Sequence, residues 1–256
     1  MRMATLEIWR PVVEALESWH AADLRAPLWL RDDDSVEPTP ALERLIDLTA
    51  EHDIPLALAV VPANAGKALA HALRAAGHVT PIVHGWAHRN YAPKGEKKQE
   101  FGLHRPIEAM RQDLSLALSK VRELFPFQLA PMFVPPWNRI APELIPILRE
   151  LDYTALSTFG ATSAENRAIP EINTHVDIID FRGTRRCREH GVLAKEIAVA
   201  LSYSFQHGRC AVGILSHHLV HDEAAFEFLA GFFSIARQEY WLSAQELIER
   251  RTGPVG

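Results

Sequence analysis

The chain has 256 residues, of which 48% are hydrophobic and 23% are charged, proportions that are ordinary for a globular protein. Its formal net charge of −5 provides no basic footprint for a polyanion, so we expect no nucleic-acid partner. Charge or proline interrupts every apolar run well before the roughly 18 residues of a membrane-spanning helix, so we expect no membrane partner.

The first 19 residues interleave charged side chains with apolar ones, which predicts an amphipathic helix rather than a secretion signal. We expect residues 1–25 to form a helix that packs on the rest of the chain. The two cysteines, Cys187 and Cys210, form neither a disulfide framework nor a CxxC zinc motif. Two unpaired thiols without a secretion signal predict a cytoplasmic protein.

Short apolar runs then alternate with longer amphipathic runs along almost the whole chain. The apolar runs predict strands at residues 28–31, 56–61, 79–83, 132–134, 154–157, 176–179 and 211–215. The amphipathic runs predict helices at residues 39–52, 65–76, 107–125, 141–151, 192–207, 223–238 and 243–250. The polar stretch 91–106 is typical of a surface loop, and Ser243 and Glu246 are spaced as a capping box.

This alternation is typical of βαβ units on a parallel sheet. About seven strands approach the eight of a complete barrel, so we predict an α/β protein with a distorted (β/α) barrel. No Gly/Ser-rich linker or low-complexity stretch divides the sequence, so residues 1–256 are expected to form a single domain. In this architecture the functional site lies at the carboxyl ends of the strands.

Three adjacent carboxylates, Asp32, Asp33 and Asp34, directly follow the first predicted strand. Crowded like charges raise one another's pKa, and a divalent cation or the neighbouring Arg31 would relieve the repulsion. The alternative interpretation is a solvated turn that caps the next helix, because aspartate is common in both places.

His84 and His88 follow the third predicted strand and lie four residues apart. If the chain turns into a helix there, both imidazoles lie on one helical face and can share a divalent ion. A carboxylate from elsewhere would complete three protein ligands with an open position, which is the arrangement of a catalytic zinc site. An accidental surface pair is the alternative in a chain with 13 histidines.

Two further runs follow predicted strands. His217 and His218 come after the strand at 211–215, where a histidine is a candidate proton donor near neutral pH. A hydrogen-bonded structural role is the alternative for at least one of the two. Trp137 follows two consecutive prolines that make the backbone rigid, and it suits either stacking on a sugar-like face or packing in the core.

Together, these four runs resemble the polysaccharide deacetylase family, the metal-dependent carbohydrate esterases that include the nodulation chitooligosaccharide deacetylase. The resemblance covers about residues 28 to 218 and rests on the order and placement of the runs. It implies a divalent metal cofactor, and nitrogen and carboxylate ligands suit zinc, with cobalt or nickel able to substitute.

The resemblance implies metal and base roles for four residues. Asp33 matches the general base and Asp34 the metal-binding carboxylate. A register one residue earlier, with Asp32 as the base and Asp33 on the metal, stays open. His84 and His88 match the two metal-binding histidines.

Further positions match residues that handle the substrate. His217 matches the general acid, and Trp137 stands where the family's aromatic contributes its backbone N–H to the oxyanion hole. Asp177, with Asp180 as an alternative, matches the orienting acidic residue of the fourth motif, and Phe181 stands where a tryptophan is usual.

The sequence also departs from the family pattern. Val134 replaces the arginine that normally orients the catalytic aspartate, and Asn138 replaces a common glycine. Arg31, two residues before Asp33, is the candidate for the missing orienting charge. These departures concern the choice of substrate more than metal binding.

We therefore expect a metal-dependent hydrolase that removes an acyl group, by cleaving an amide C–N bond, from an N-acylated amino sugar or a related molecule. One alternative is a hydrolase of a small non-carbohydrate amide on the same fold, which the absent secretion signal favours. A second is a non-catalytic carbohydrate-binding barrel, which the lost arginine favours. The expected partner is a small carbohydrate or amide substrate, and a homo-oligomer is compatible with the sequence.

Overall fold

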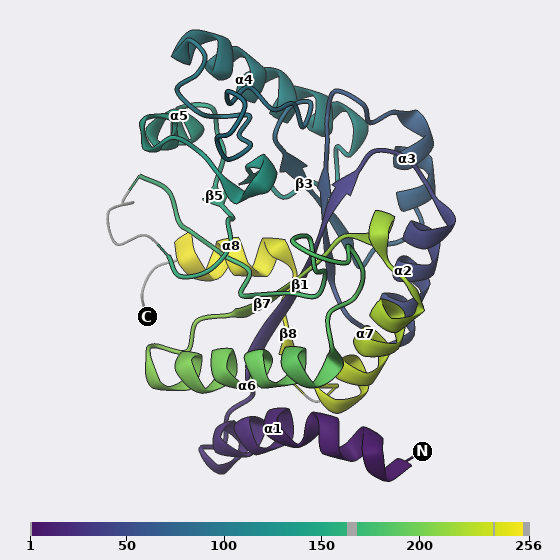
Figure 1. Ribbon diagram of the computed structural model, residues 1–256. Coiled ribbons are helices and arrows are strands. Elements are labelled where there is room, and N and C mark those ends of the chain that lie inside the picture. Colours follow the sequence, from purple (N-terminus) through teal and green to yellow (C-terminus); the bar gives the residue numbers. More distant parts are fainter. Residues whose placement is uncertain (1, 163–167, 238, 253–256) are drawn as a thin grey trace.

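The computed structural model describes residues 2–162, 168–237 and 239–252, and eight strands of this part form one sheet (Figure 1). The strands are β1 (Pro27–Ser35), β2 (Leu56–Val60), β3 (Val79–His84), β4 (Met132–Val134), β5 (Ala155–Leu156), β6 (Val176–Asp177), β7 (Val212–Ser216) and β8 (Tyr240–Trp241). Their order is β5-β4-β3-β2-β1-β7-β6, with β8 paired to the start of β1. Each of these pairings is parallel, so the carboxyl ends of the strands share one edge, and the curled sheet confirms the predicted distorted barrel.

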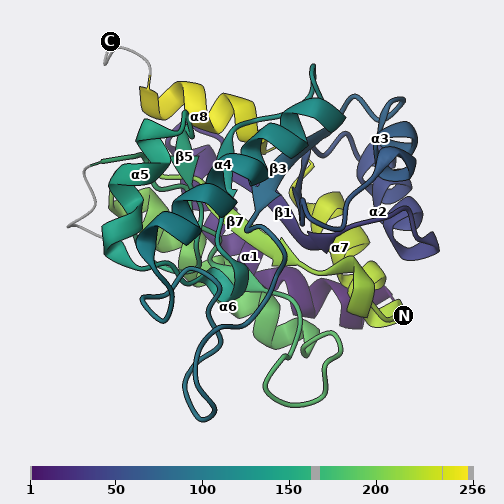
Figure 2. The same ribbon diagram turned by 90° about the horizontal axis from the view of Figure 1, so that it is seen from above.

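Helices surround the sheet, and α8 lies across strands on the face away from α6 and α7 (Figures 1 and 2). The helices are α1 (Arg2–Ala21), α2 (Pro40–Glu51), α3 (Lys67–Leu73), α4 (Ile107–Leu124), α5 (Ile145–Glu150), α6 (His190–Gln206), α7 (Glu223–Ile235) and α8 (Ala244–Thr252), with 3-10 turns η1 (Pro136–Asn138), η2 (Pro142–Leu144) and η3 (His218–Val220). The N-terminal helix α1 packs on the rest, with Trp9, Leu16 and Trp19 buried in the main core.

The core has two parts because strand side chains alternate between the two faces of the sheet. Leu58 and the other large residues of β2 pack in the main cluster with the outer helices. Ala57 and Ala59, on the opposite face, belong to a second cluster with Leu247 and Ile248 of α8. On β2, the small side chains of Ala57 and Ala59 leave room for α8 against the sheet.

Most predicted elements lie within a few residues of the observed ones. Thr39 caps α2 through a hydrogen bond to the Leu42 amide, and Ser243 and Glu246 form the predicted capping box at α8. Residues 91–106 form a loop, as expected. Among the described residues, no helix is both long and apolar enough to cross a membrane.

Several predicted boundaries are wrong. The first strand extends to Ser35, because its pairing with β7 reaches Asp32 and its pairing with β2 resumes at Ser35, so the aspartates lie in the strand rather than after it. The helix predicted for 141–151 is divided into η2 and α5, each of which carries a proline near its start. The helix predicted for 223–238 ends at Ile235, its last predicted residue lying outside the described part, and the two-residue β8 was not predicted.

Candidate metal and hydrolytic centre

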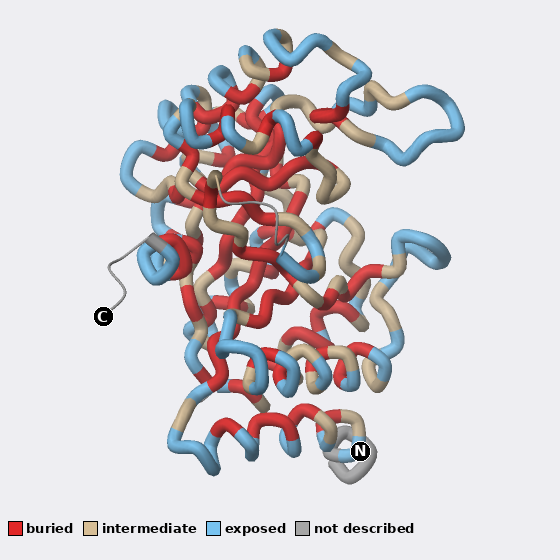
Figure 3. Tube along the Cα trace, turned by 90° about the vertical axis from the view of Figure 1, so that its left-hand side faces the viewer, coloured by how far each residue is buried: buried red, intermediate tan, exposed pale blue. Residues whose placement is uncertain are grey.

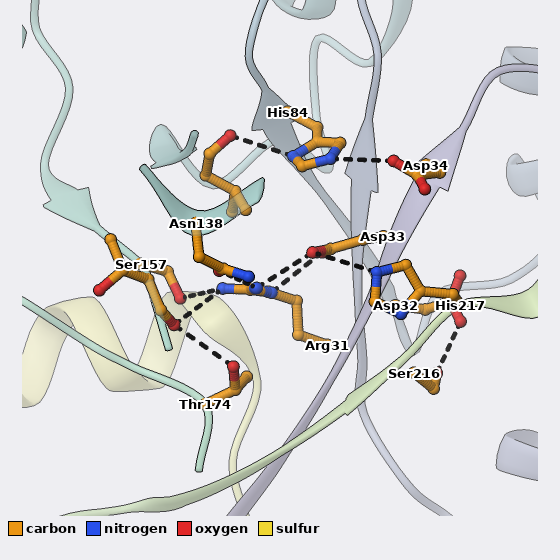
Figure 4. A network of polar contacts seen from close by, with 12 residues as sticks. Arg31, Asp32, Asp33, Asp34, His84, Asn138, Ser157, Thr174, Ser216 and His217 are labelled. Carbon is orange, nitrogen blue, oxygen red and sulfur yellow. Dashed lines mark hydrogen bonds and ion pairs between the residues drawn. The ribbon is translucent and has the colours of Figure 1, made fainter. Parts of the chain in front are cut away.

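The three aspartates at the end of β1 have three different sets of partners (Figure 4). Asp33 pairs with Arg31, Asp34 contacts His84 and His88, and the Asp32 carboxylate bonds to residues of the β7 end. The β1–β2 register shifts between Asp32 and Ser35, and Asp34 has a left-handed backbone with φ 72°. This irregularity takes Asp34 out of the strand alternation. The aspartates do not cap the next helix, since Thr39 is the N-cap of α2.

Asp34, His84 and His88 form a group with the geometry of a metal site. Asp34 Oδ1 lies 3.0 Å from His84 Nε2 and 3.2 Å from His88 Nε2, and one ligand atom from each residue lies within 4.8 Å of the others. Tetrahedral zinc with ligand bonds of about 2.0–2.2 Å would place its ligand atoms roughly 3.3–3.6 Å apart. The three side chains therefore need little movement to hold one ion.

The hydrogen bonds of His84 favour a cation at this place. Its Nδ1 lies 3.1 Å from the Val134 carbonyl, which can only accept, so Nδ1 carries a proton. In the neutral ring, Nε2 is then an acceptor, yet it faces the Asp34 carboxylate, another acceptor. A proton or a metal ion resolves this conflict. Burial opposes the charged imidazole, but Asp33 and Asp34 outweigh it and raise the pKa of His84.

His88 reaches the site from a loop, and the helix considered for residues 84–88 is absent. Gly85 has φ 59°, and a Cβ there would lie 2.3 Å from Glu100 Oε2, so glycine is required. The buried Glu100 carboxylate accepts hydrogen bonds from the backbone N–H groups of Trp86, Ala87 and Arg89. Sequence reasoning missed this anchor, because a glutamate in a polar loop is ordinarily exposed.

Arg31 is fully buried and holds Asp33 by two contacts. Its Nε lies 2.9 Å from Asp33 Oδ1, and a second guanidinium nitrogen donates to Asp33 Oδ2 at 3.0 Å. The remaining N–H groups donate to Asn138 Oδ1 at 2.7 Å, Ser157 Oγ at 2.7 Å and the Thr158 carbonyl. The guanidinium is therefore fixed from several sides, and Asn138, the residue that departs from the family's glycine, is one of its partners.

His217 lies between two carboxylates at the end of β7. Its Nε2 is 4.0 Å from Asp33 Oδ2 and its Nδ1 is 4.0 Å from Asp177 Oδ1. The exposed ring of Phe181 packs edge-on against the imidazole, with 4.5 Å between centroids. Burial raises the pKa of Asp177, although the charge of His217 opposes this shift. Asp180 does not join this group, because its carboxylate accepts hydrogen bonds from its own loop.

Asp32 is hydrogen-bonded, through its carboxylate, to the two residues that precede and follow His217 in the sequence. Its buried carboxylate accepts from Ser216 Oγ at 2.6 Å and the His218 amide at 2.9 Å, and His218 Nδ1 lies 2.5 Å from its Oδ1. Burial opposes ionisation of Asp32, but the charge of His218 and these hydrogen bonds lower its pKa. Asp32 is thus bonded to His218 and Ser216 and is not a member of the group that Asp34, His84 and His88 form.

Trp137 is partly buried beside His88, with 4.4 Å between ring centroids. Pro135 has an extended backbone, and Pro136 begins the 3-10 turn η1. Trp137, the next residue, has a left-handed backbone with φ 57°. Such a conformation is uncommon for a bulky residue. The ring lies against His88 and belongs to neither hydrophobic core cluster of the described residues.

No family model matches the sequence, and no curated protein matches it either. Solved structures do match. A putative polysaccharide deacetylase from Mycobacterium smegmatis is 16% identical, with a TM-score of 0.60 over 82% of this chain and 76% of the other. A family 4 acetyl xylan esterase from Clostridium thermocellum in complex with a cobalt ion is 14% identical, with a TM-score of 0.53 over 89% and 92%.

A pseudoenzyme of the same carbohydrate esterase family, from Bacillus anthracis, is also similar. It is 14% identical, with a TM-score of 0.58 over 87% of this chain and 66% of that one. The similar structures thus include proteins described as a deacetylase and an esterase and one described as a pseudoenzyme, at identities that establish the architecture alone. The chain therefore has the fold of the polysaccharide deacetylases and family 4 carbohydrate esterases, the fold that its sequence motifs predict.

Proposed function

We propose that the protein is a metal-dependent hydrolase that removes an acyl group from an N-acylated amino sugar. The observation that carries this proposal is the placement of one two-histidine, one-carboxylate group beside Asp33 and His217 at the carboxyl ends of β1, β3 and β7. Three ligands with an open position suit catalysis better than a purely structural site.

Asp34, His84 and His88 would hold the metal ion, and their nitrogen and carboxylate atoms suit zinc. Such an ion, when bound, lowers the pKa of water and polarises a carbonyl group. The Val134 carbonyl supports this assignment, because it fixes His84 with Nε2 free to bind a cation.

Asp33 is the proposed general base. It removes a proton from the water that attacks the acyl carbon, while Arg31 holds the carboxylate in its orientation through two contacts. Arg31 thus supplies the orienting positive charge, which in the family comes from an arginine at the position that Val134 occupies here. The backbone N–H of Trp137 is proposed to donate to the oxyanion as it develops.

His217 is the proposed general acid. Its Nε2, on the side of Asp33, protonates the departing amine nitrogen, so that the C–N bond breaks to give a carboxylic acid and an amine. Asp177, on the Nδ1 side, orients the ring. With Asp32 as partner of His218 and Ser216, the favoured register has Asp33 as base and Asp34 on the metal.

A non-catalytic barrel is the second candidate, and the Bacillus anthracis pseudoenzyme is the observation that favours it. The Arg31–Asp33 pair argues against this candidate. Burying an ion pair costs desolvation energy, and a protein that only binds a sugar has no need of a buried, ion-paired carboxylate beside the site.

A screen of zinc-loaded protein separates these candidates. The substrates are N-acetylated amino sugars, N-acetylated amines without a sugar, and O-acetylated sugars, and the measured quantity is released acetate. Release from the amino sugars supports the proposal, whereas release from the non-sugar amines alone identifies a small-amide hydrolase. Binding of the amino sugars without release would establish a binding protein, and Asp33→Asn provides the inactive control.

A further inference from the structure

Two exposed loops project from the same side of the molecule and follow strands that carry site residues (Figures 2 and 3). The first, residues 89–99, connects β3, which ends at His84, to α4. The second, residues 180–189, connects β6, which ends at Asp177, to α6. Because parallel strands end at one edge of the sheet, both loops border the candidate site.

Both loops are basic, in contrast to the net charge of −5 of the chain. Their exposed cations are Arg89, Lys94, Lys97 and Lys98 in the first loop and Arg182, Arg185 and Arg186 in the second. The carboxylate of Asp180 is occupied by backbone N–H groups of its own loop, and Glu96 lies 3.6 Å from His104. Counting all charged residues, the first loop has four cations and one carboxylate, and the second has four cations, with Arg188, and two carboxylates, Asp180 and Glu189. Each loop therefore keeps a net positive charge.

One cation in each loop is linked to a site histidine through an aromatic ring. Lys98 Nζ lies 5.9 Å from the centre of the Trp137 ring, and this ring contacts His88. Arg185 lies 6.0 Å from the centre of the Phe181 ring, and this ring contacts His217. Each cation thus lies beside an aromatic ring that contacts a site histidine, Lys98 on the side of His88 and Arg185 on the side of His217.

We propose that the N-acylated substrate carries an anionic group, a carboxylate or a phosphate, and that Lys98 and Arg185 recognise it. This inference rests on the proposed function, since it concerns the substrate of the same site. Cations at the rim of a site raise the local concentration of an anionic ligand and strengthen its binding, and both effects weaken with salt. Surface charge elsewhere on this acidic chain would repel the same ligand.

Equilibrium binding tests the proposal without requiring turnover. The ligands are N-acetylglucosamine, N-acetylmuramic acid, which adds a carboxylate, and N-acetylglucosamine 6-phosphate, each titrated by calorimetry into zinc-loaded protein at low and high salt. We expect tighter binding of at least one anionic ligand than of the neutral sugar, and the preference should shrink at high salt. The anion that gains more distinguishes carboxylate from phosphate.

Variants assign the effect to the loops. Lys98→Gln and Arg185→Gln should each weaken anionic binding by about two- to fivefold, the range of an exposed ion pair, and leave the neutral sugar unaffected. Arg149→Gln is the control, because this exposed cation lies in the last turn of α5, away from both loops. Equal affinity for neutral and anionic ligands, or an equal loss for Arg149→Gln, would overturn the proposal.

Two further outcomes separate this inference from the proposed function. Selective binding of the anionic sugars without acetate release would leave the inference standing while the hydrolase assignment fails. Acetate release at equal efficiency from neutral and anionic sugars would support the hydrolase assignment and contradict the inference of an anionic substrate. Inorganic polyphosphate that binds as tightly as the anionic sugars would show a general polyanion surface and would also overturn the proposal.

Discussion

Replacing Arg31 by methionine should strongly destabilise the protein, because it leaves the buried Asp33 carboxylate without its cation. The two side chains are 0% and 3% exposed and make contacts of 2.9 and 3.0 Å. Removing one partner of a buried ion pair typically costs about 3–5 kcal/mol in free energy of unfolding. Arg31→Met also leaves Asn138 and Ser157 without a donor, which adds to the loss.

A matched surface pair is the control. Arg44 makes two hydrogen bonds to Glu223, at 2.8 and 2.6 Å, but these side chains are 50% and 66% exposed. Arg44→Met should therefore cost less than about 1 kcal/mol. Urea denaturation in the presence of a chelator gives both values without a contribution from metal binding.

The double variant Arg31→Met/Asp33→Leu tests the pairing itself. If the two charges interact directly, the double variant should be about 1–3 kcal/mol more stable than the sum of the single changes predicts. Additive losses, or a cost of Arg31→Met no larger than that of Arg44→Met, would refute the assignment of Arg31 as the partner of Asp33.

Three other predictions follow from the site. Asp33→Asn should abolish acetate release and keep the zinc content, whereas Asp34→Ala should lose both; equal zinc loss, measured by mass spectrometry, would instead favour the register with Asp33 on the metal. His217→Ala should slow amide hydrolysis by about 10²–10⁴-fold and slow an activated ester much less, while His218→Ala should leave that difference intact; an equal loss on both substrates would remove the general-acid role. Burial is the main cause that lowers the pKa of His221 to about 4, and the charges of His218 and His217 lower it further. The carboxylates of Asp32 and Asp222 oppose this decrease. Between about pH 6.5 and pH 4, this histidine is therefore protonated in the unfolded chain but neutral in the native state, so the free energy of unfolding should fall as the pH falls through this range. In urea titrations, His221→Leu should show a smaller decrease over the same range.

The order of strands and helices could be predicted from the sequence because apolar periodicity is a local property. The 3.6-residue pattern of α2 and α4 and the unbroken apolar run of β2 are both visible without tertiary information. The division between η2 and α5 and the two-residue β8 depend on prolines and on pairing with β1, which the local pattern does not contain.

The candidate ligands could be predicted by residue type and placement, but the geometry that unites them could not. Asp34 joins the histidines because the register of β1 shifts, and His88 reaches them through a left-handed glycine rather than a helix. The buried Glu100 that anchors this loop carries no signal in the sequence, since only the fold brings it beneath the backbone of residues 86–89.

Zinc titration of the metal-stripped protein, with acetate release from an N-acetylated amino sugar as the readout, tests the central claim most directly. If Asp34, His84 and His88 form one catalytic metal site, activity should be absent without metal and should saturate at one zinc per chain. Acetate release that is unchanged by stripping, or a chain that binds one zinc and releases no acetate from any N-acetylated sugar, would contradict it.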